Sequence, residues 1–248
     1  MKSKWFAYNS DNEGAELKLL LFPYAGGGPS IFINWKKLID RRADVYPVLY
    51  PFREARRSEL LPGSLNELGK MIAAENEAVF KGKYAVFGHC AGSLIAYETL
   101  CEAARLYGTQ PEFIIASGAE PPGNIPDDVS YLRNSDEKEF LEYLISCGFV
   151  DGSARENTGF LTYYLPIIKE DFKLSFAYKP GELRKFDCPV YLFRGREDKT
   201  VNASDQQLWE NYTSAGIEEF LFEGGHYYFS GAPDEVCGQI NKIIAKEI

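Results

Sequence analysis

Short apolar, strand-like runs alternate with helical patterns along most of this chain. The runs are rich in leucine, valine, isoleucine and aromatic residues, whereas the helical patterns repeat an apolar residue every three or four positions. Strands that alternate with helices run parallel, and the helices cover both faces of the sheet. The pattern therefore predicts an α/β fold with a mostly parallel central sheet flanked by helices. The expected strands are Leu17–Tyr24, Val45–Pro51, Tyr84–Gly88, Glu112–Ser117, Pro189–Gly195 and Ile217–Glu223, and the expected helices are Ser30–Asp40, Ser64–Phe80, Ala91–Leu106, Ser204–Thr213 and Pro233–Ile248.

The alternation is interrupted between Glu120 and Asp187, where two helical patterns occur without a strand-like run. A segment of this length is too long for a plain loop. We predict a helical lid over the end of the sheet, which opens with the turn-rich residues 121–128. The two lid helices are expected at Glu137–Cys147 and Thr158–Tyr178.

Length and composition favour one globular domain. A chain of 248 residues, 45% hydrophobic and 25% charged, can bury a single α/β core, so we expect one domain over residues 1–248. Its apolar runs fall far short of the ~18 residues that a membrane span needs, and its first residues lack the apolar stretch of a signal peptide. We therefore expect a cytoplasmic protein with no membrane partner.

Charge and cysteine content exclude further classes. Asp and Glu outnumber Lys and Arg by 36 to 27, and no basic stripe offsets the net charge of −9, so nucleic acid is not an expected partner. Five scattered cysteines without a C-x-x-C pair, together with only two histidines, argue against a disulfide scaffold and a zinc site. We expect a monomer without a metal or cofactor.

The sharpest motif is Gly88-His89-Cys90-Ala91-Gly92, between an expected strand and an expected helix. A residue between two glycines in a strand–turn–helix is typical of a nucleophile, because the glycines leave room where strand and helix crowd together. The cysteine side chain would project in front of the free N–H groups at the start of the helix. Taken alone, the motif also fits a buried structural cysteine.

His226 and Asp198 could complete a catalytic triad with this cysteine. A thiol with a pKa of ~8.5 is mostly protonated at neutral pH, so a neighbouring imidazole is needed to form the thiolate. Asp198 and His226 follow the last two expected strands, in the chain order of an α/β-hydrolase triad. Glu197 and Asp205 compete with Asp198 to orient the imidazole. His89 is a poor candidate for the base, since strand alternation should send its side chain away from Cys90.

A glycine-rich bend, Phe22-Pro23-Tyr24-Ala25-Gly26-Gly27-Gly28, follows the first expected strand. It lacks the residues that would complete a P-loop or a dinucleotide motif. Such a bend can instead turn a backbone N–H towards the nucleophile. We predict an oxyanion hole made by the backbone N–H groups of Ala25 and Ala91, with a flexible turn of no catalytic role as the alternative.

These motifs resemble those of the type II, or external, thioesterases of nonribosomal peptide and polyketide synthesis, within the α/β-hydrolases. The resemblance implies a hydrophobic acyl channel under a helical lid, with Tyr24, Phe160 and Tyr164 as candidate substrate-binding residues. It also implies Asp198 as the acid, at the end of a G-x-x-D segment. The resemblance covers about residues 17 to 245 and is carried by Phe22–Gly28, Tyr50–Arg53 with Arg57, Phe87–Gly92, Leu165-Pro166 with Glu170-Asp171-Phe172, and Gly225–Phe229.

Two positions depart from the family pattern. Pro51-Phe52-Arg53 replaces the usual Pro-Gly-Arg, which leaves open whether Arg53 and Arg57 contact phosphopantetheine or form a solvated face. Cys90 stands where the family usually has serine, and Ser93 lies a turn too far into the helix to replace it. Attack by a thiol on a thioester gives another thioester, so the acyl group would stay activated.

Three functions follow from these residues. The first is a thioesterase that hydrolyses acyl or peptidyl groups from the phosphopantetheine arm of a carrier protein, its partner, through Cys90, His226 and Asp198. The second is an acyltransferase or cyclase that passes the same acyl group to an amine or alcohol. The third is a carrier-protein-binding module without catalytic activity.

Overall fold

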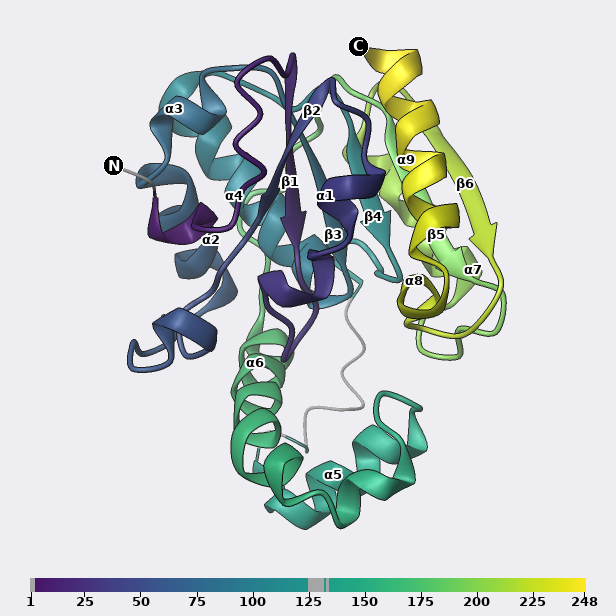
Figure 1. Ribbon diagram of the computed structural model, residues 1–248. Coiled ribbons are helices and arrows are strands. Elements are labelled where there is room, and N and C mark those ends of the chain that lie inside the picture. Colours follow the sequence, from purple (N-terminus) through teal and green to yellow (C-terminus); the bar gives the residue numbers. More distant parts are fainter. Residues whose placement is uncertain (1–2, 125–131, 133) are drawn as a thin grey trace.

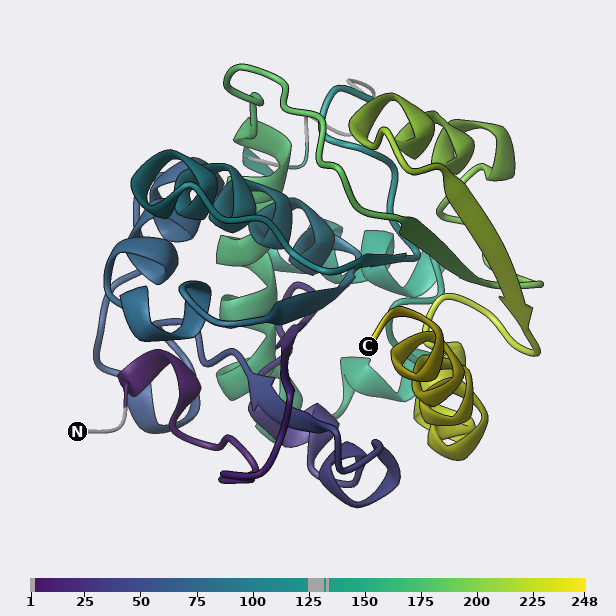
Figure 2. The ribbon, with the colours of Figure 1, turned by 90° about the horizontal axis from the view of Figure 1, so that it is seen from above.

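The computed structural model describes residues 3–124, 132 and 134–248. Six strands form one parallel sheet in the order β2-β1-β3-β4-β5-β6, with helices packed on both faces (Figures 1 and 2). The predicted α/β architecture with a parallel central sheet is therefore confirmed. The strands are β1 (Leu17–Phe22), β2 (Ala43–Pro47), β3 (Tyr84–His89), β4 (Ile114–Ser117), β5 (Val190–Gly195) and β6 (Ile217–Phe222).

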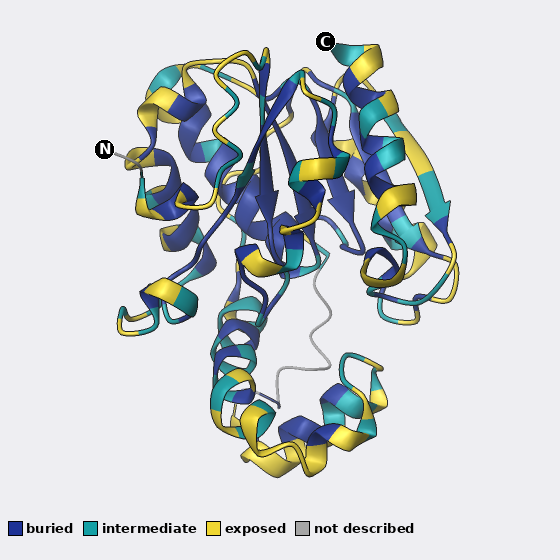
Figure 3. Cartoon of the chain, viewed as in Figure 1, coloured by how far each residue is buried: buried dark blue, intermediate teal, exposed yellow. Residues whose placement is uncertain are grey.

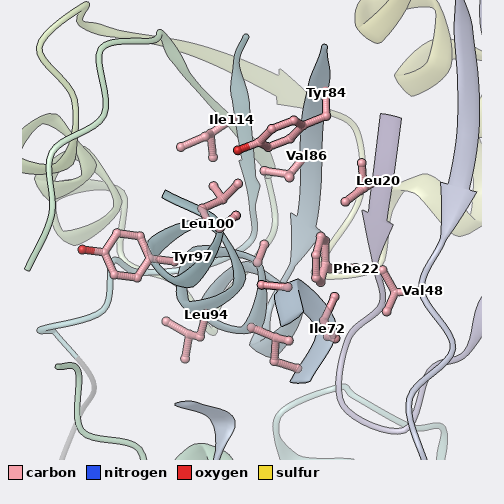
Figure 4. Packing of buried hydrophobic residues seen from close by; sticks show 14 of the residues in the cluster. Leu20, Phe22, Val48, Ile72, Tyr84, Val86, Leu94, Tyr97, Leu100 and Ile114 are labelled. Atoms are coloured by element: carbon pink, nitrogen blue, oxygen red, sulfur yellow. The ribbon is translucent and has the colours of Figure 1, made fainter. Parts of the chain in front are cut away.

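Most strands are buried on both sides because each face of the sheet carries a separate hydrophobic core (Figure 3). Along β1, Leu20 and Phe22 enter the first core, shown in Figure 4, whereas Leu19 and Leu21 enter the second. This alternation explains the nearly continuous apolar strands of the sequence. The first core is covered by α2 (Leu65–Ala74), α3 (Glu77–Phe80) and α4 (Ala91–Tyr107), and the second by α1 (Trp35–Leu38), α8 (Tyr228–Gly231) and α9 (Pro233–Glu247).

Three expected helices are interrupted or shortened. The helix predicted over Ser64–Phe80 divides into α2 and α3 because Asn76 leaves the helical region, with φ −135° and ψ 41°. Short 3-10 turns replace part of the helices predicted over Ser30–Asp40 and Ser204–Thr213, and further 3-10 turns lie in the connections. The 3-10 turns outside the segment between β4 and β5 are η1 (Lys4–Phe6), η2 (Pro29–Phe32), η3 (Glu54–Arg56) and η7 (Gln207–Tyr212), the last of which follows α7 (Ala203–Gln206).

A helical insertion connects β4 to β5 and lies beyond the carboxyl ends of the strands (Figure 1). Residues 125–131 and 133 of the lid predicted between Glu120 and Asp187 fall outside the described residues. The helix predicted over Thr158–Tyr178 contains a π-helical turn that continues into an α-helix. The helical insertion consists of α5 (Glu137–Ser146), η5 (Gly152–Arg155), the π-helical η6 (Phe160–Tyr164) and α6 (Leu165–Ala177).

Within the described ranges, no helix combines the length and the apolar character needed to cross a membrane. All five cysteines carry free thiols. The fold is therefore held together by the two cores and their hydrogen-bonded sheet rather than by covalent links between distant segments.

Two helix glycines provide a test of how tightly α2 packs on α4. A Cβ at Gly69 would lie 2.7 Å from Glu98 Cβ and 2.8 Å from Thr99 N, whereas a Cβ at Gly238 in α9 would meet nothing within 4 Å. We expect Gly69→Ala to lower the free energy of unfolding by about 1–3 kcal/mol through overpacking. Gly238→Ala should raise it by about 0.5–1 kcal/mol, because alanine favours helix. Urea denaturation measures both, and equal effects would contradict the close packing.

Candidate active site

Cys90 lies in a strained turn between β3 and α4, as the glycine pattern predicts. Its φ of 53° and ψ of −125° are unusual for a residue with a side chain. A Cβ on Gly88 would lie 2.5 Å from Ser93 Cα, and a Cβ on Gly92 would lie 2.3 Å from Phe22 O. Both glycines are thus required for the close approach of α4 to the sheet. The Cys90 N–H donates to Ser117 O over 2.9 Å, which fixes the turn to β4.

The structure brings Asp198, rather than Glu197, to His226. Asp198 Oδ2 and His226 Nδ1 are 2.8 Å apart, and both side chains are buried. Glu197 is exposed. Because a carboxylate can only accept, Nδ1 carries a proton and Nε2 is left to face other groups.

Thr200 is a further residue of this network, and the sequence analysis missed it. Its hydroxyl lies 2.7 Å from Asp198 Oδ1 and 2.8 Å from His226 Nδ1, and its N–H donates to the same carboxylate oxygen over 2.9 Å. Thr200 therefore holds the acid and the imidazole together. A threonine two positions after a candidate acid is the only signal that the sequence offers for it.

The pKa values of the pair favour an imidazolium next to a carboxylate. Burial lowers the pKa of His226, but the hydrogen bond to Asp198 and the nearby Cys90 thiol outweigh burial and raise the pKa to about 9. Burial raises the pKa of Asp198, but the contacts with His226 and Thr200 reverse this and lower the pKa to about 2. Cys90 is close enough to affect the imidazole, although the two groups form no hydrogen bond of ordinary geometry: His226 Nε2 is buried without a partner among the described residues.

His89 lies next to the candidate base. Its ring centroid lies 4.7 Å from that of His226, because strand alternation places His89 on the face of Phe87, and both rings contact Phe229 there. Its Nδ1 is 2.7 Å from Ser117 Oγ, which in turn contacts the Tyr228 hydroxyl. Burial holds the pKa of His89 well below its usual range. His89 is thus a neutral support beneath His226.

The two predicted oxyanion donors line the same cavity as Cys90 and His226. Ala25 and Ala91 border a cavity of about 530 Å³ together with Cys90 and His226. Neither alanine N–H donates to any group within the part of the chain that the structure describes. Both amides are therefore available to an oxygen bound in front of Cys90, and their catalytic role stays a prediction.

The predicted substrate-binding residues line a neighbouring cavity. Tyr24, Phe160 and Tyr164 border a space of about 660 Å³ whose lining does not include Cys90 or His226. The two cavities meet at Ala25, Phe149 and Phe172, which line both. The glycine-rich bend therefore stands between two chambers, a first one that contains Cys90 and an aromatic second one.

Arg53 does not form the solvated face that the sequence left open. Its side chain is only 2% exposed and makes a bidentate ion pair with Asp171 of α6. Arg57 lies partly buried, with its guanidinium over the rings of Phe52 and Tyr163. The solvated face is wrong for Arg53 because α6 and the glycine-rich bend cover it.

As for metals, residues 3–124, 132 and 134–248 hold no group of three or more His, Cys, Asp or Glu side chains placed to bind an ion.

Comparison with known proteins identifies the family. The Thioesterase domain family matches residues 17–244. The chain belongs to the thioesterase family. This thioesterase is 25% identical to gramicidin S biosynthesis protein GrsT of Aneurinibacillus migulanus, over 99% of this chain and 97% of that protein. It is 27% identical to thioesterase PikA5 of Streptomyces venezuelae, over 91% of this chain and 80% of that protein.

Solved structures agree on the fold of this thioesterase. ClbQ from the colibactin NRPS/PKS pathway superposes with a TM-score of 0.86 at 24% identity, over 94% of this chain and 98% of that one. The α/β-hydrolase fold is thereby confirmed. Membership of the family makes the protein an enzyme that acts on thioester bonds.

The raised pKa of His226 predicts how the stability of the thioesterase depends on pH. A group whose pKa rises from 6.5 to about 9 on folding stabilises the native state fully below pH 6.5, and this contribution is lost as pH rises through 9. We expect the free energy of unfolding to fall from pH 6.5 to pH 9 in the wild type. Asp198→Asn should flatten this dependence, whereas Glu197→Gln, next in the chain and exposed, should keep it. Urea denaturation across the range measures the slope, and an unchanged slope in Asp198→Asn would refute the assignment.

Proposed function

We propose that this thioesterase hydrolyses acyl or peptidyl groups from the phosphopantetheine thiol of carrier proteins in nonribosomal peptide or polyketide synthesis. The observation that carries the proposal is Cys90, strained at the start of α4 in one cavity with His226, which Asp198 orients. The names of the relatives, a gramicidin S biosynthesis protein among them, support the choice of pathway. We further propose a cytoplasmic monomer that uses no cofactor of its own.

Each residue has one task in the proposed reaction. His226 Nε2 takes the thiol proton of Cys90, which gives the imidazolium that its raised pKa favours, and the sulfur attacks the thioester carbon. The carbonyl oxygen becomes an oxyanion that accepts from the N–H groups of Ala25 and Ala91. The pantetheine thiol leaves with the proton from His226. The neutral His226 then takes a proton from water, which attacks acyl-Cys90, and returns the proton to the Cys90 sulfur as the free acid is released. Asp198 stays ionised and holds the imidazole in position.

The two chambers fit the two branches of a thioester. The reacting carbon carries an acyl chain and a sulfur-linked pantetheine, and the oxyanion donor Ala25 stands where the chambers meet. We assign the acyl chain to the aromatic chamber with Tyr24, Phe160 and Tyr164. The pantetheine arm then reaches Cys90 through the first chamber. The helical insertion forms the roof of both chambers and in this proposal serves as a lid.

The central test is the acylation of Cys90. We expect octanoyl-loaded carrier protein to give an adduct of one octanoyl group on Cys90 and free octanoic acid, followed by mass spectrometry. Cys90→Ala should abolish both, with a loss of about 10⁶ in kcat, because the nucleophile is removed. Cys147→Ala, which removes another thiol of the same cavity, is the matched control and should keep turnover.

The products of that experiment also separate the competing functions. An adduct on any residue other than Cys90 overturns the assignment. Because acyl-Cys90 is still a thioester, an amine can compete with water for it. Amide in place of acid, with an amine present, would favour an acyltransferase or cyclase. If the protein binds the carrier protein but gives neither an adduct nor turnover, the result would favour the third function, a carrier-protein-binding module without catalytic activity.

Chain-length preference tests the assignment of the aromatic chamber. Phe160→Ala enlarges this chamber, so we expect kcat/KM for dodecanoyl relative to butyryl carrier protein to rise about tenfold, since each methylene in an apolar pocket is worth about 1–3 kcal/mol. Leu161→Ala, in the same π-helical turn but outside the lining, is the control. An unchanged ratio in Phe160→Ala would place the acyl chain elsewhere.

A further inference from the structure

We propose that Asp171, on α6 of the helical insertion, is a positioning residue that sets the direction of the Ala25 N–H. The inference rests on the proposed function, in which this amide stabilises the oxyanion. Asp171 touches neither Cys90 nor His226 in any recorded contact. It acts through the bend Tyr24–Gly27, which it contacts at the Gly26 N–H.

The bend is a tight turn whose geometry fixes the Ala25 amide. Gly27 N–H donates to Tyr24 O over 2.8 Å, and Gly26 has φ 86° as the third residue of the turn. The Tyr24 carbonyl and the Ala25 N–H belong to one planar peptide and point in opposite directions. A turn that holds the carbonyl inward therefore directs the Ala25 N–H outward.

Asp171 holds the next peptide of the same turn. Its Oδ2 accepts from Gly26 N–H over 2.6 Å and from Arg53 Nη1 over 2.7 Å, while Oδ1 accepts from Arg53 Nη2 over 2.6 Å. Arg53 Nη1 also donates to Gly27 O over 2.9 Å. The ion pair thus contacts the turn at two places, Gly26 N–H and Gly27 O. These two groups flank the Gly27 N–H, whose hydrogen bond to Tyr24 O closes the turn.

The Arg53–Asp171 ion pair that holds the turn is buried. Arg53 is 2% exposed and Asp171 8%, so water cannot easily replace either partner. One helical turn earlier on α6, Ile168 packs against the same bend: a Cβ on Gly26 would lie 2.3 Å from Ile168 Cγ1. The helical insertion therefore packs on the glycine-rich bend through the Asp171 carboxylate and the Ile168 side chain, which lie on the same face of α6.

The geometry leads to a specific functional expectation. Without an acceptor at position 171, the Gly26 N–H loses its partner, and the tight turn that holds the Tyr24–Ala25 peptide opens more easily. The Ala25 N–H then spends less time in the direction that the oxyanion needs. Oxyanion stabilisation should fall, which lowers kcat, whereas KM should change little with the residue at position 171, because Asp171 lines neither chamber.

Two double variants isolate the acceptor. In Arg53→Met/Asp171→Leu the buried charges are removed together, which avoids an unpaired charge that would unfold the chain. Arg53→Met/Asp171→Asn is matched to it but keeps an amide oxygen for the Gly26 N–H. Glu170→Gln, a neighbour on α6 whose side chain pairs with Lys173 and is 45% exposed, controls for the helix itself.

Two probes of Cys90 separate oxyanion stabilisation from thiol reactivity. Octanal adds to the thiol: the S–C bond forms, the C=O π bond opens, and the oxygen occupies the oxyanion position. Iodoacetamide forms an S–C bond with loss of iodide and needs no oxyanion. We expect the leucine variant to fall about 10- to 100-fold below the asparagine variant in kcat and in octanal affinity, with alkylation of the two within threefold. Glu170→Gln should stay close to wild type in all three.

The outcomes distinguish this inference from the proposed function. If the folded leucine and asparagine variants have the same kcat and octanal affinity, the positioning role of Asp171 is overturned while the proposed function stands. Equal losses in alkylation and octanal binding would also overturn it, because they indicate a general distortion around Cys90. A wild type that neither binds octanal nor forms an acyl adduct overturns both proposals.

Discussion

The close approach of α4 to β1 and β3 is the constraint on which the whole site depends. Glycines at 88 and 92 remove the two Cβ atoms that would keep the helix away, and the approach forces Cys90 to positive φ. Such a conformation costs about 1–3 kcal/mol and persists only where the surroundings determine it. Here the surroundings are two hydrophobic cores and a hydrogen bond from Cys90 to β4. The parallel sheet supplies the rest, because its strands end at one edge and bring residues after β5 and β6 to the same place.

The sequence was sufficient for the sheet and for most of the candidate triad. All six strands overlap the predicted runs. Strands β1 to β5 are mostly buried on both faces and leave a nearly continuous apolar signal, whereas β6 is partly exposed. Asp198 could be selected over Glu197 through the resemblance to the family, whose G-x-x-D segment ends at Asp198, shortly after β5. The helix breaks were not predictable from periodicity: Asn76 interrupts an amphipathic pattern without a proline or glycine to mark it.

Contacts between distant segments account for what the sequence could not supply. Arg53 and Asp171 are 118 positions apart, and only the packing of α6 on the glycine-rich bend turns an apparently solvated arginine into a buried one. Thr200 lacked a distinctive signal because loop threonines are common. His89 follows the alternation of β3, but the sequence could not show that His226 approaches the same face of the sheet. The two neighbouring cavities also depend on contacts between distant segments, since Phe149 and Phe172, which line both, come from the helical insertion.

Cysteine as the proposed nucleophile changes the role of His226 during turnover. The interaction with Cys90 is one of the causes that raise the pKa of this imidazole to about 9, so the free enzyme favours its protonated form at neutral pH. Acylation converts the thiol into a thioester that can neither donate a proton nor carry a charge. The part of the pKa shift that Cys90 contributes is then lost, while burial continues to favour the neutral ring. In the proposed mechanism, loss of the Cys90 contribution leaves a larger fraction of His226 unprotonated when the acceptor must be activated, while the hydrogen bond to Asp198 keeps the imidazole in position. This applies to water and to an amine alike, so access of water to acyl-Cys90 decides between hydrolysis and transfer.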